Sequence, residues 1–292
     1  MILILGSSGY FGSQFIKEIQ SRNLKYAWLK SPSLLSNGDY DVTGWSSILT
    51  HIKNYQPTLV LNCAAYVDPR GVDYNEQDRE QTLQANLLLP TMLAHACEVT
   101  DTPLMHLSTA CLYQGDNGGH GWTEDDAPHL NVNTCGIYVA SKIMAERVVR
   151  QWRKSWICRV RLPFDGIDHP RNLLTKLAKF QYVVSETQSL THRGDAVSAM
   201  LDMWQNGVEF GTYHLTSPGA VNYLELCDKI NLARFNGKRK FCFMSQEVFD
   251  ATQARTIKSR CVLNTTKLAK AGVKMRHSNE AIDDALTNWR EE

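Results

Sequence analysis

The stretch MILILGSSGYFG, residues 1–12, decides the fold of this 292-residue chain. Its opening apolar run is typical of a parallel strand that is buried on both faces of a sheet. Gly6, Gly9 and Gly12 follow at once. The next segment, as far as Ile19, has the spacing of an amphipathic helix. One face of this predicted helix carries Phe11, Phe15, Ile16 and Ile19.

A glycine-rich turn between a buried strand and a helix lets a pyrophosphate approach the backbone, because no Cβ atoms stand in the way. The N–H groups and the dipole of the helix N-terminus then stabilise the phosphate charge. The turn therefore predicts dinucleotide binding. We expect the cofactor contacts of this turn to come from Gly6, Ser8, Gly9, Tyr10, Phe11 and Gly12.

The residues after the second predicted strand, 25–29, bear on which dinucleotide is bound. An Asp or Glu at this strand end would hold the ribose hydroxyl of NAD and repel a 2′-phosphate. Lys30 and Ser31 stand there instead, so the sequence permits NADP. NAD stays open, because Ser31 and Ser33 are equally compatible with a plain loop.

Two later strand ends are also expected to contact the cofactor. Asp41 and Val42 are predicted to close a short third strand. The fourth predicted strand, 58–62, runs into three small residues that would let the chain pass close beneath a flat cofactor ring. These residues are Cys63, Ala64 and Ala65.

Strand and helix patterns continue to alternate along the chain. Further strands are predicted at 104–108, 156–162 and 211–215, and residues 76–99 are predicted to form one long helix. Asn86 lies within that helix, either on its surface or buried against a neighbouring strand. The alternation predicts an α/β fold, a doubly wound parallel sheet of the Rossmann type.

The chain is expected to divide into two parts. Residues 1–163 would form the dinucleotide-binding Rossmann domain, with residues 190–217 returning to it. Residues 164–292 would form a smaller C-terminal substrate-binding lobe. Within this later part we expect helices at 172–180 and 195–204, a short apolar segment at 182–184, and core positions Leu263, Leu268 and Ile282.

Tyr138 and Lys142 are the most informative pair of polar residues. Four residues apart on a predicted helix, they project from one face, so the ammonium favours the phenolate and makes the tyrosine a better acid. Thr109 and Cys111 follow the strand at 104–108, at the end where open parallel sheets bind their ligands. Alone, a Tyr–Lys pair is more often a solvated helix face, but the glycine turn in the same chain favours the catalytic interpretation.

Composition excludes several classes of partner. The formal net charge of +1 gives no electrostatic case for nucleic acid or an anionic membrane. No apolar run reaches the ~18 residues that span a bilayer, and no leader pattern precedes the first strand, so we expect a cytoplasmic protein. The eight cysteines include no C-x-x-C pair, which favours reduced thiols and predicts no metal site.

Taken together, these motifs resemble those of the extended short-chain dehydrogenase/reductases that act on nucleotide sugars. The resemblance is carried by the glycine turn, the segments Asn62-Cys63-Ala64-Ala65 and Ser108-Thr109, and the Tyr138–Lys142 pair. It is strongest to the 3,5-epimerase/4-keto-reductases of rhamnose synthesis and more distant to dTDP-4-dehydrorhamnose reductase. The blocks RVRLP at 159–163 and HPRNLLTK at 169–176 are typical of the bifunctional branch.

The resemblance implies roles for individual residues. Thr109, Tyr138 and Lys142 would be the reductase triad, with Tyr138 and Lys142 also holding the cofactor. Cys111 would be an epimerisation acid/base, and Lys176 its partner. His169 stands where a non-ionisable residue is expected and is the alternative to Lys176, and residues 115–121 match the family poorly. Substrate contacts would come from Thr109, Cys111, Asn172 and Arg260, with Arg255 as a second candidate for the diphosphate.

The implied chemistry is consistent with these side chains. A ketone at C4 acidifies the C3 and C5 protons, so a thiolate and a second ionisable group could exchange them. A nicotinamide, NADP(H) with NAD(H) possible in its place, would then supply hydride to C4 while Tyr138 donates a proton. The resemblance thus implies conversion of UDP- or dTDP-4-keto-6-deoxy-D-glucose to the corresponding L-rhamnose-type sugar.

Two other functions stay open. The chain could be a 4-keto-reductase alone, with Cys111 an inert buried residue. It could also be a non-catalytic nucleotide-binding regulatory subunit, although such a module has no need for both Tyr138 and Lys142. The expected partner is a nucleotide-sugar small molecule, with no nucleic acid and no membrane, and a homodimer is left open.

Overall fold

A computed structural model describes residues 1–29, 42–133, 135–252 and 258–291. The chain divides into two compact units. Unit 1 contains Met1–Thr109, Asn131–Arg159 and Met200–Tyr213, and unit 2 contains Ala110–Leu130, Val160–Ala199 and His214–Glu292. The chain therefore passes between the units several times.

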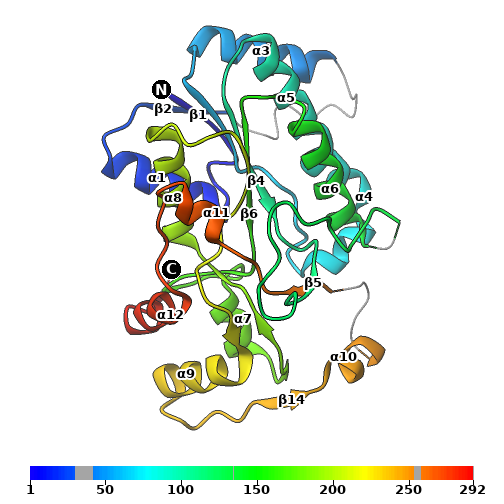
Figure 1. Cartoon of the computed structure of the whole chain (residues 1–292), viewed down its shortest axis with the longest axis vertical. Coiled ribbons are helices and arrows are strands. Elements are labelled where there is room, and N and C mark those ends of the chain that lie inside the picture. The colour runs from blue at the N-terminus through cyan, green and yellow to red at the C-terminus, as the bar shows by residue number, and fades with distance from the viewer. Residues whose placement is uncertain (30–41, 134, 253–257, 292) are drawn as a thin grey trace. The chain divides into compact units, whose positions relative to one another are not determined.

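Unit 1 is built on a six-stranded sheet with strand order β12-β6-β4-β3-β1-β2. The strands β1, β2, β3 and β4 pair in parallel. Figure 1 shows α1 and α8 on one side of this sheet and α3, α5 and α6 on the other. The prediction of a doubly wound α/β sheet is thereby confirmed. The strands are β1 (Ile2–Leu5), β2 (Tyr26–Leu29), β3 (Leu59–Asn62), β4 (Leu104–Thr109), β6 (Ser155–Val160) and β12 (Gly211–His214).

The helices of unit 1 cover the sheet through apolar faces. In α1, Phe11, Phe15 and Ile19 are buried as the spacing predicts. A shared core under α3 and α5 includes Leu3, Ile48 and Leu93. The α-helices are α1 (Tyr10–Ser21), α3 (Val42–Tyr55), α4 (Arg79–Leu83), α5 (Leu89–Val99), α6 (Ile137–Val149) and the C-terminal part of α8 (Arg193–Gln205).

The helix predicted at 76–99 is found from Arg79 to Val99, but it is not a uniform α-helix. A 3₁₀ helix, η1 (Val72–Gln77), precedes it, and a π-helical turn, η2 (Gln84–Leu88), lies between α4 and α5. Asn86 in η2 is fully buried, and its side-chain amide exchanges hydrogen bonds of 2.8 and 2.9 Å with the backbone of Tyr66. Helical periodicity contains no trace of this tertiary contact, which ties η2 to the segment after β3.

Of the third strand predicted to end at Asp41 and Val42, only Val42 lies among the described residues, and its assignment to a strand is wrong. Val42 is the first residue of helix α3, and Asp41 lies outside the described residues. Lys30, Ser31 and Ser33, which bear on the choice between NAD and NADP, lie outside them too.

Unit 2 is made of short strand pairs and small helices. Its core includes Leu174, Ile230 and Ile282, and the predicted core positions Leu263 and Leu268 are buried as well. The strands are β5 (Gln114–Gly115), β7 (Pro163–Phe164), β8 (Ile167–Asp168), β9 (Tyr182–Val184), β10 (Thr187–Gln188), β11 (Thr191–His192), β13 (Val221–Asn222), β14 (Cys242–Met244), β15 (Arg260–Cys261) and β16 (Arg290–Glu291). The helices are α7 (Leu173–Lys179), the N-terminal part of α8, α9 (Tyr223–Phe235), α10 (Gln246–Thr252), α11 (Thr266–Lys270) and α12 (Ser278–Thr287).

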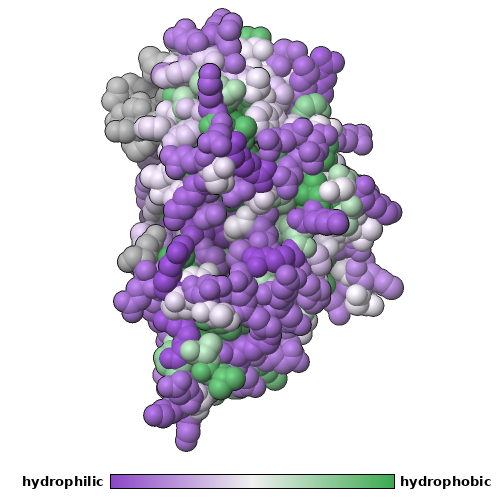
Figure 2. Space-filling view, turned by 90° about the vertical axis from the view of Figure 1, so that its left-hand side faces the viewer, coloured by the Kyte–Doolittle hydropathy of each residue, from purple (hydrophilic) through white to green (hydrophobic). Residues whose placement is uncertain are grey.

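The visible surface is mainly hydrophilic. Figure 2 shows hydrophobic residues as small separate patches among polar ones on the face that it presents. Among the described residues, no helix combines the length and apolar character needed to cross a membrane. The same residues contain no cluster of three or more His, Cys, Asp or Glu side chains arranged to hold a metal ion.

Candidate active site

The glycine turn lies at the point where the strand order of the sheet reverses. β1 is flanked by β2 and β3, so the chain leaves β1 beside the end of β3. Open α/β sheets bind their ligands at this point. Gly6 has a φ of +78°, and a Cβ on it would come within 2.5 Å of the Ala64 backbone nitrogen. The structure thus brings the turn close to the backbone of Ala64. The cofactor contacts predicted for both segments stay a prediction.

The start of α1 closes the turn. The Gly9 N–H donates to the Gly6 carbonyl at 3.0 Å, and α1 begins immediately afterwards at Tyr10. A Cβ on Gly12 would overlap the Gly6 carbonyl group. Phe11 is buried and packs in the core of unit 1, which gives it a structural role in addition to the predicted cofactor contact. The helix N-terminus is therefore held directly behind the turn.

We expect Gly12→Ala to weaken dinucleotide binding, because the added methyl group displaces the turn from the helix start. Overpacking of this kind typically costs about 1–3 kcal/mol, roughly 5- to 150-fold in affinity. Fluorescence titration with NADPH and NADH measures the change. Ser13→Ala, one residue further along the same helix, is the matched control and should bind normally. Equal affinity of Gly12→Ala and wild-type protein would contradict the assigned cradle.

The three residues predicted as the reductase triad all belong to unit 1. Thr109 is the last residue of β4, and Tyr138 and Lys142 lie one turn apart on α6. The Lys142 ammonium donates a hydrogen bond of 3.0 Å to the Leu107 carbonyl, two residues before Thr109. The Ser141 hydroxyl donates to the Tyr138 carbonyl at 2.7 Å. α6 is therefore fixed against β4, with Lys142 reaching the strand that ends in Thr109.

Burial determines the electrostatics of Lys142. Its side chain is buried, and desolvation lowers its pKa to about 8, while the charge of Glu146 opposes that shift. A pKa near 8 leaves the ammonium mostly protonated at neutral pH, as a group that stabilises a phenolate must be. His106 on β4 stays neutral nearby, because burial and then the Lys142 charge hold its pKa well below the usual range.

Glu146 is a supporting residue that the sequence analysis missed. It lies one turn after Lys142 and accepts hydrogen bonds from the Ser108 hydroxyl at 2.6 Å and from Arg159 at 2.7 Å. Both partners of this ion pair are almost fully buried. The carboxylate thus links β4, α6 and β6, the three elements on which the triad depends. The sequence offered one indication of this role, since Glu146 stands four residues after Lys142 and therefore lies on the same face of the predicted helix.

Cys111 and the residues predicted to work with it belong to unit 2. The Cys111 thiol is partly exposed and accepts a 3.6 Å hydrogen bond from the Arg161 guanidinium. Lys176 lies in the last turn of α7, where burial, followed by the charge of Arg171, lowers its pKa. A lysine with a lowered pKa is a better proton carrier at neutral pH. The His169 ring accepts a 2.9 Å hydrogen bond from the Arg171 N–H at Nδ1.

The side chain of Asn172 is occupied within unit 2. Its carbonyl oxygen caps α7 by accepting from the Leu174 N–H at 2.9 Å. Its amide group donates to the carbonyls of Asp165 and Ile167, each at 2.7 Å. This arrangement favours a structural role for the side chain, and its assignment as a substrate ligand stays a prediction.

Arg260 on β15 is also engaged with neighbouring side chains. Its guanidinium pairs with Glu186 at 2.7 Å and with Asp250 at 3.1 Å. These carboxylates balance its charge, so diphosphate binding by Arg260 would require a rearranged pair. Its substrate role stays a prediction, and Arg255 lies outside the described residues.

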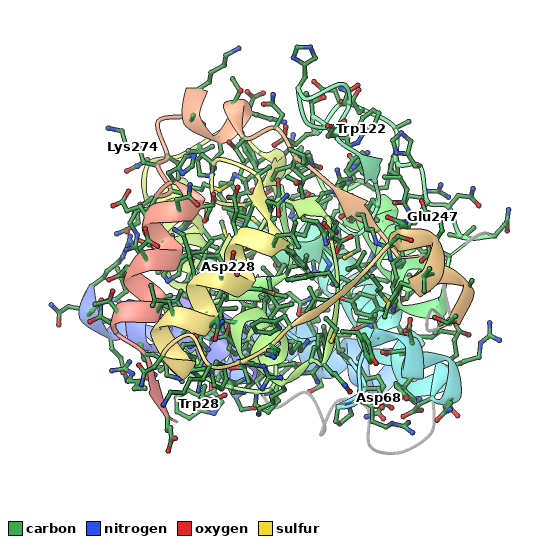
Figure 3. All side chains as sticks on the ribbon, turned by 90° about the horizontal axis from the view of Figure 1, so that it is seen from below. Trp28, Asp68, Trp122, Asp228, Glu247 and Lys274 are labelled. Carbon is green, nitrogen blue, oxygen red and sulfur yellow. The ribbon has the colours of Figure 1, made fainter. Side chains whose placement is uncertain are left out.

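The loop that follows Cys111 is anchored on β15. β5 pairs with β15, and the Trp122 indole donates to the Gln114 carbonyl at 2.9 Å. Figure 3 labels Trp122 on this loop. Gly115, Gly118, Gly119 and Gly121 have positive φ values, which explains the glycine-rich composition of this segment. The Gln114 side-chain amide also donates to the Lys258 carbonyl at 2.7 Å, so the loop contacts the chain on both sides of Ser259.

Comparisons with known proteins agree with this architecture. The family described as RmlD substrate binding domain matches residues 1–291. A bifunctional dTDP-4-dehydrorhamnose 3,5-epimerase/dTDP-4-dehydrorhamnose reductase from Arabidopsis thaliana is 26% identical over 232 residues, covering 77% of this chain and 73% of that protein. A dTDP-4-dehydrorhamnose reductase from Mycobacterium tuberculosis is 25% identical and covers 76% of this chain and 71% of its own length.

A solved structure shows the same fold. The crystal structure of a UDP-rhamnose synthase from Acanthamoeba polyphaga mimivirus superimposes with a TM-score of 0.86 at 23% sequence identity. The match covers 98% of each chain. The fold of this chain is therefore one that is already known from experiment.

Proposed function

The chain belongs to the RmlD substrate-binding domain family, and on that premise we propose that it reduces the 4-keto group of a nucleotide-linked 6-deoxyhexose and also epimerises C3 and C5. The observation that carries the reductase half is the anchoring of Lys142 on the strand that ends in Thr109, with Tyr138 one turn away. The bifunctional relative and the Cys111–Arg161 contact support the epimerase half.

The glycine turn suits the pyrophosphate of a dinucleotide, since Gly6 packs against the backbone of Cys63 and Ala64, and Gly12 against Gly6, at distances that no Cβ would allow. This close packing holds the N-terminus of α1 directly behind the turn. Reduced nicotinamide, when bound, supplies the hydride. NADP(H) is our proposed cofactor, with NAD(H) as the alternative. The turn and the start of α1 hold the phosphates, and Tyr138 and Lys142 complete the cofactor contacts.

In the proposed reduction, Thr109 and Tyr138 polarise the C4 carbonyl oxygen by hydrogen bonding. Tyr138 donates its phenolic proton to that oxygen as it becomes an alkoxide, and the Lys142 ammonium stabilises the phenolate that remains. The buried Glu146 carboxylate helps to keep Lys142 charged. An anchored triad of this kind is not needed by a nucleotide-binding regulatory subunit, and it therefore favours an enzyme.

In the proposed epimerisation, Cys111 as thiolate removes a proton from C3 or C5, and the electron pair moves to the C4 oxygen. Lys176, or His169 in its place, returns a proton to the opposite face of the ring. The lowered pKa of Lys176 favours it over His169. A reductase that lacks this second activity is the alternative, and the Mycobacterium tuberculosis relative has a name that mentions only reduction.

One experiment tests both halves. Purified protein is incubated in D₂O with NADPH and either UDP- or dTDP-4-keto-6-deoxy-D-glucose. We expect nicotinamide absorbance to fall and deuterium to appear at C3 and C5 of the product. Oxidation of NADPH with a pre-epimerised sugar, but no deuterium from the non-epimerised sugar, would leave a reductase alone. No oxidation with either sugar would exclude the proposed activity.

A further inference from the structure

Arg161 is a buried cation with an unusual set of partners. Only 2% of the residue is exposed. Its guanidinium donates to the Ser259 hydroxyl at 3.0 Å, to the Ser259 carbonyl at 2.7 Å and to the Gln188 side-chain carbonyl. All of these acceptors are neutral. The remaining acceptor is Cys111 Sγ, 3.6 Å from Nη1.

No carboxylate of the described residues lies within ion-pair distance of Arg161, and its Nε has no hydrogen-bond partner there. A buried charge is costly unless an opposite charge or strong hydrogen bonds compensate it. Arg159, two residues earlier, is compensated in the usual way, because the buried Glu146 carboxylate forms an ion pair with it at 2.7 Å. Among the acceptors of Arg161, Cys111 is the one that can become an anion.

The other titratable groups that face Arg161 are Cys261, Glu186 and Tyr223. Burial raises the pKa of Cys261 and of Tyr223, so both stay neutral. The Cys261 thiol also donates to the Ala110 carbonyl at 3.7 Å, which requires its proton.

Glu186 already forms an ion pair with a different cation. It pairs with Arg260 at 2.7 Å, and burial raises its pKa. It therefore does not supply a dedicated counter-charge for Arg161. Cys111 differs from these groups in being partly exposed and in facing Arg161 as an acceptor.

We propose that Arg161 is the positioning residue that holds Cys111 Sγ as the thiolate, the form that takes a proton from carbon. The proposal rests on the proposed function for its chemical purpose, but the thiolate itself can be measured without substrate. On taking a proton, the thiolate becomes a thiol and the carbon-bound electron pair becomes the enolate. The Arg161 guanidinium stays charged and then faces a neutral thiol, and release of the thiol proton to solvent restores the thiolate–guanidinium pair.

Alkylation kinetics test this inference. Wild-type protein is treated with iodoacetamide from pH 5 to 10, and each cysteine peptide is quantified by mass spectrometry. A thiol that ionises two pH units lower than an ordinary cysteine has about 50-fold more thiolate at pH 6.5, but each thiolate is about tenfold less nucleophilic. Its alkylation rate at pH 6.5 is therefore about fivefold higher. We expect that gain for Cys111 relative to the exposed Cys242.

Two variants show whether Arg161 is responsible. Arg161→Gln should move the alkylation profile of Cys111 to higher pH and remove the fivefold gain. Arg161→Lys, which keeps a cation, should restore most of it. The buried Cys227 in the same unit reports folding, because it should resist alkylation unless the variant unfolds. A purely structural role for Arg161 would not move the profile of a folded protein.

The outcomes separate this inference from the proposed function. The inference is overturned if the pH dependence of Cys111 alkylation in the wild-type protein is the same as that of Cys242. It is also overturned if Arg161→Gln leaves the pH dependence of Cys111 alkylation unchanged while Cys227 stays protected. If the Arg161→Gln variant unfolds, the pH dependence of Cys111 alkylation in the wild-type protein and in Arg161→Lys still tests the inference. Alkylation of Cys111 at low pH in a protein that never exchanges C3 or C5 protons of the sugar supports the Cys111–Arg161 pair and excludes the epimerase half of the proposed function.

Discussion

We expect Tyr138→Phe to lose about 10²- to 10⁴-fold in the rate of 4-keto-sugar reduction, the typical contribution of a positioned general acid. The variant keeps the aromatic ring on α6 and removes only the hydroxyl that would donate the proton. Lys142 stays anchored on the Leu107 carbonyl, because that hydrogen bond does not involve Tyr138. Cofactor binding should therefore be largely retained.

Stopped-flow or steady-state measurement of nicotinamide absorbance gives the rate, and fluorescence titration gives cofactor affinity. Tyr55→Phe is the matched control, since it makes the same change on α3 of the same unit at an exposed position. A Tyr138→Phe rate within about threefold of wild type would show that another group donates the proton, because such a donor contributes far more than that.

Local sequence patterns predicted the sheet well, because the signals are short-range. Apolar runs gave β1, β3 and β4, and Gly6 follows β1 at the turn that only glycine tolerates. The return of a late strand at 211–215 to the sheet was also predicted, and β12 is found in the sheet, at its edge. Alternation of strands and helices was sufficient to set the fold class.

Local patterns missed a feature that depends on a contact between distant residues. The helix predicted at 76–99 takes a π-helical turn where Asn86 bonds to Tyr66, 20 residues earlier. Val42 was assigned to a strand, although it begins α3. Periodicity describes one segment at a time, so it could not show that a side chain leaves its helix surface to satisfy another part of the backbone.

The sequence proposed acids and bases for the candidate site, but it did not indicate the buried charged residues that contact them. Tyr138 and Lys142 stand out by spacing, whereas Glu146 and Arg161 resemble ordinary charged residues of a helix and a strand end. Their importance comes from burial: Glu146 compensates Arg159, and Arg161 faces Cys111. Burial of a particular charge is a property of the folded chain, which no single-sequence pattern specified.

We expect Cys111→Ala to abolish deuterium incorporation at C3 and C5 from the non-epimerised 4-keto sugar, because no thiolate remains to remove the proton. The same variant should still oxidise NADPH when supplied with a sugar that another enzyme has already epimerised. Thr109, Tyr138 and Lys142 are unchanged in it and lie in unit 1, whereas Cys111 lies in unit 2. The loss in exchange rate should reach the ~10²–10⁴-fold typical of a missing general base.

Cys242→Ala is the matched control, since it removes an exposed thiol from the same unit and should exchange normally. Lys176→Ala and His169→Ala, measured in parallel, show which residue returns the proton. The lowered pKa of Lys176 predicts the larger loss for Lys176→Ala. Unchanged deuterium incorporation in Cys111→Ala would exclude the thiol as the base. Loss of both exchange and reduction would instead place Cys111 in substrate binding, because a dedicated epimerisation base is not needed for hydride transfer to a sugar that is already epimerised.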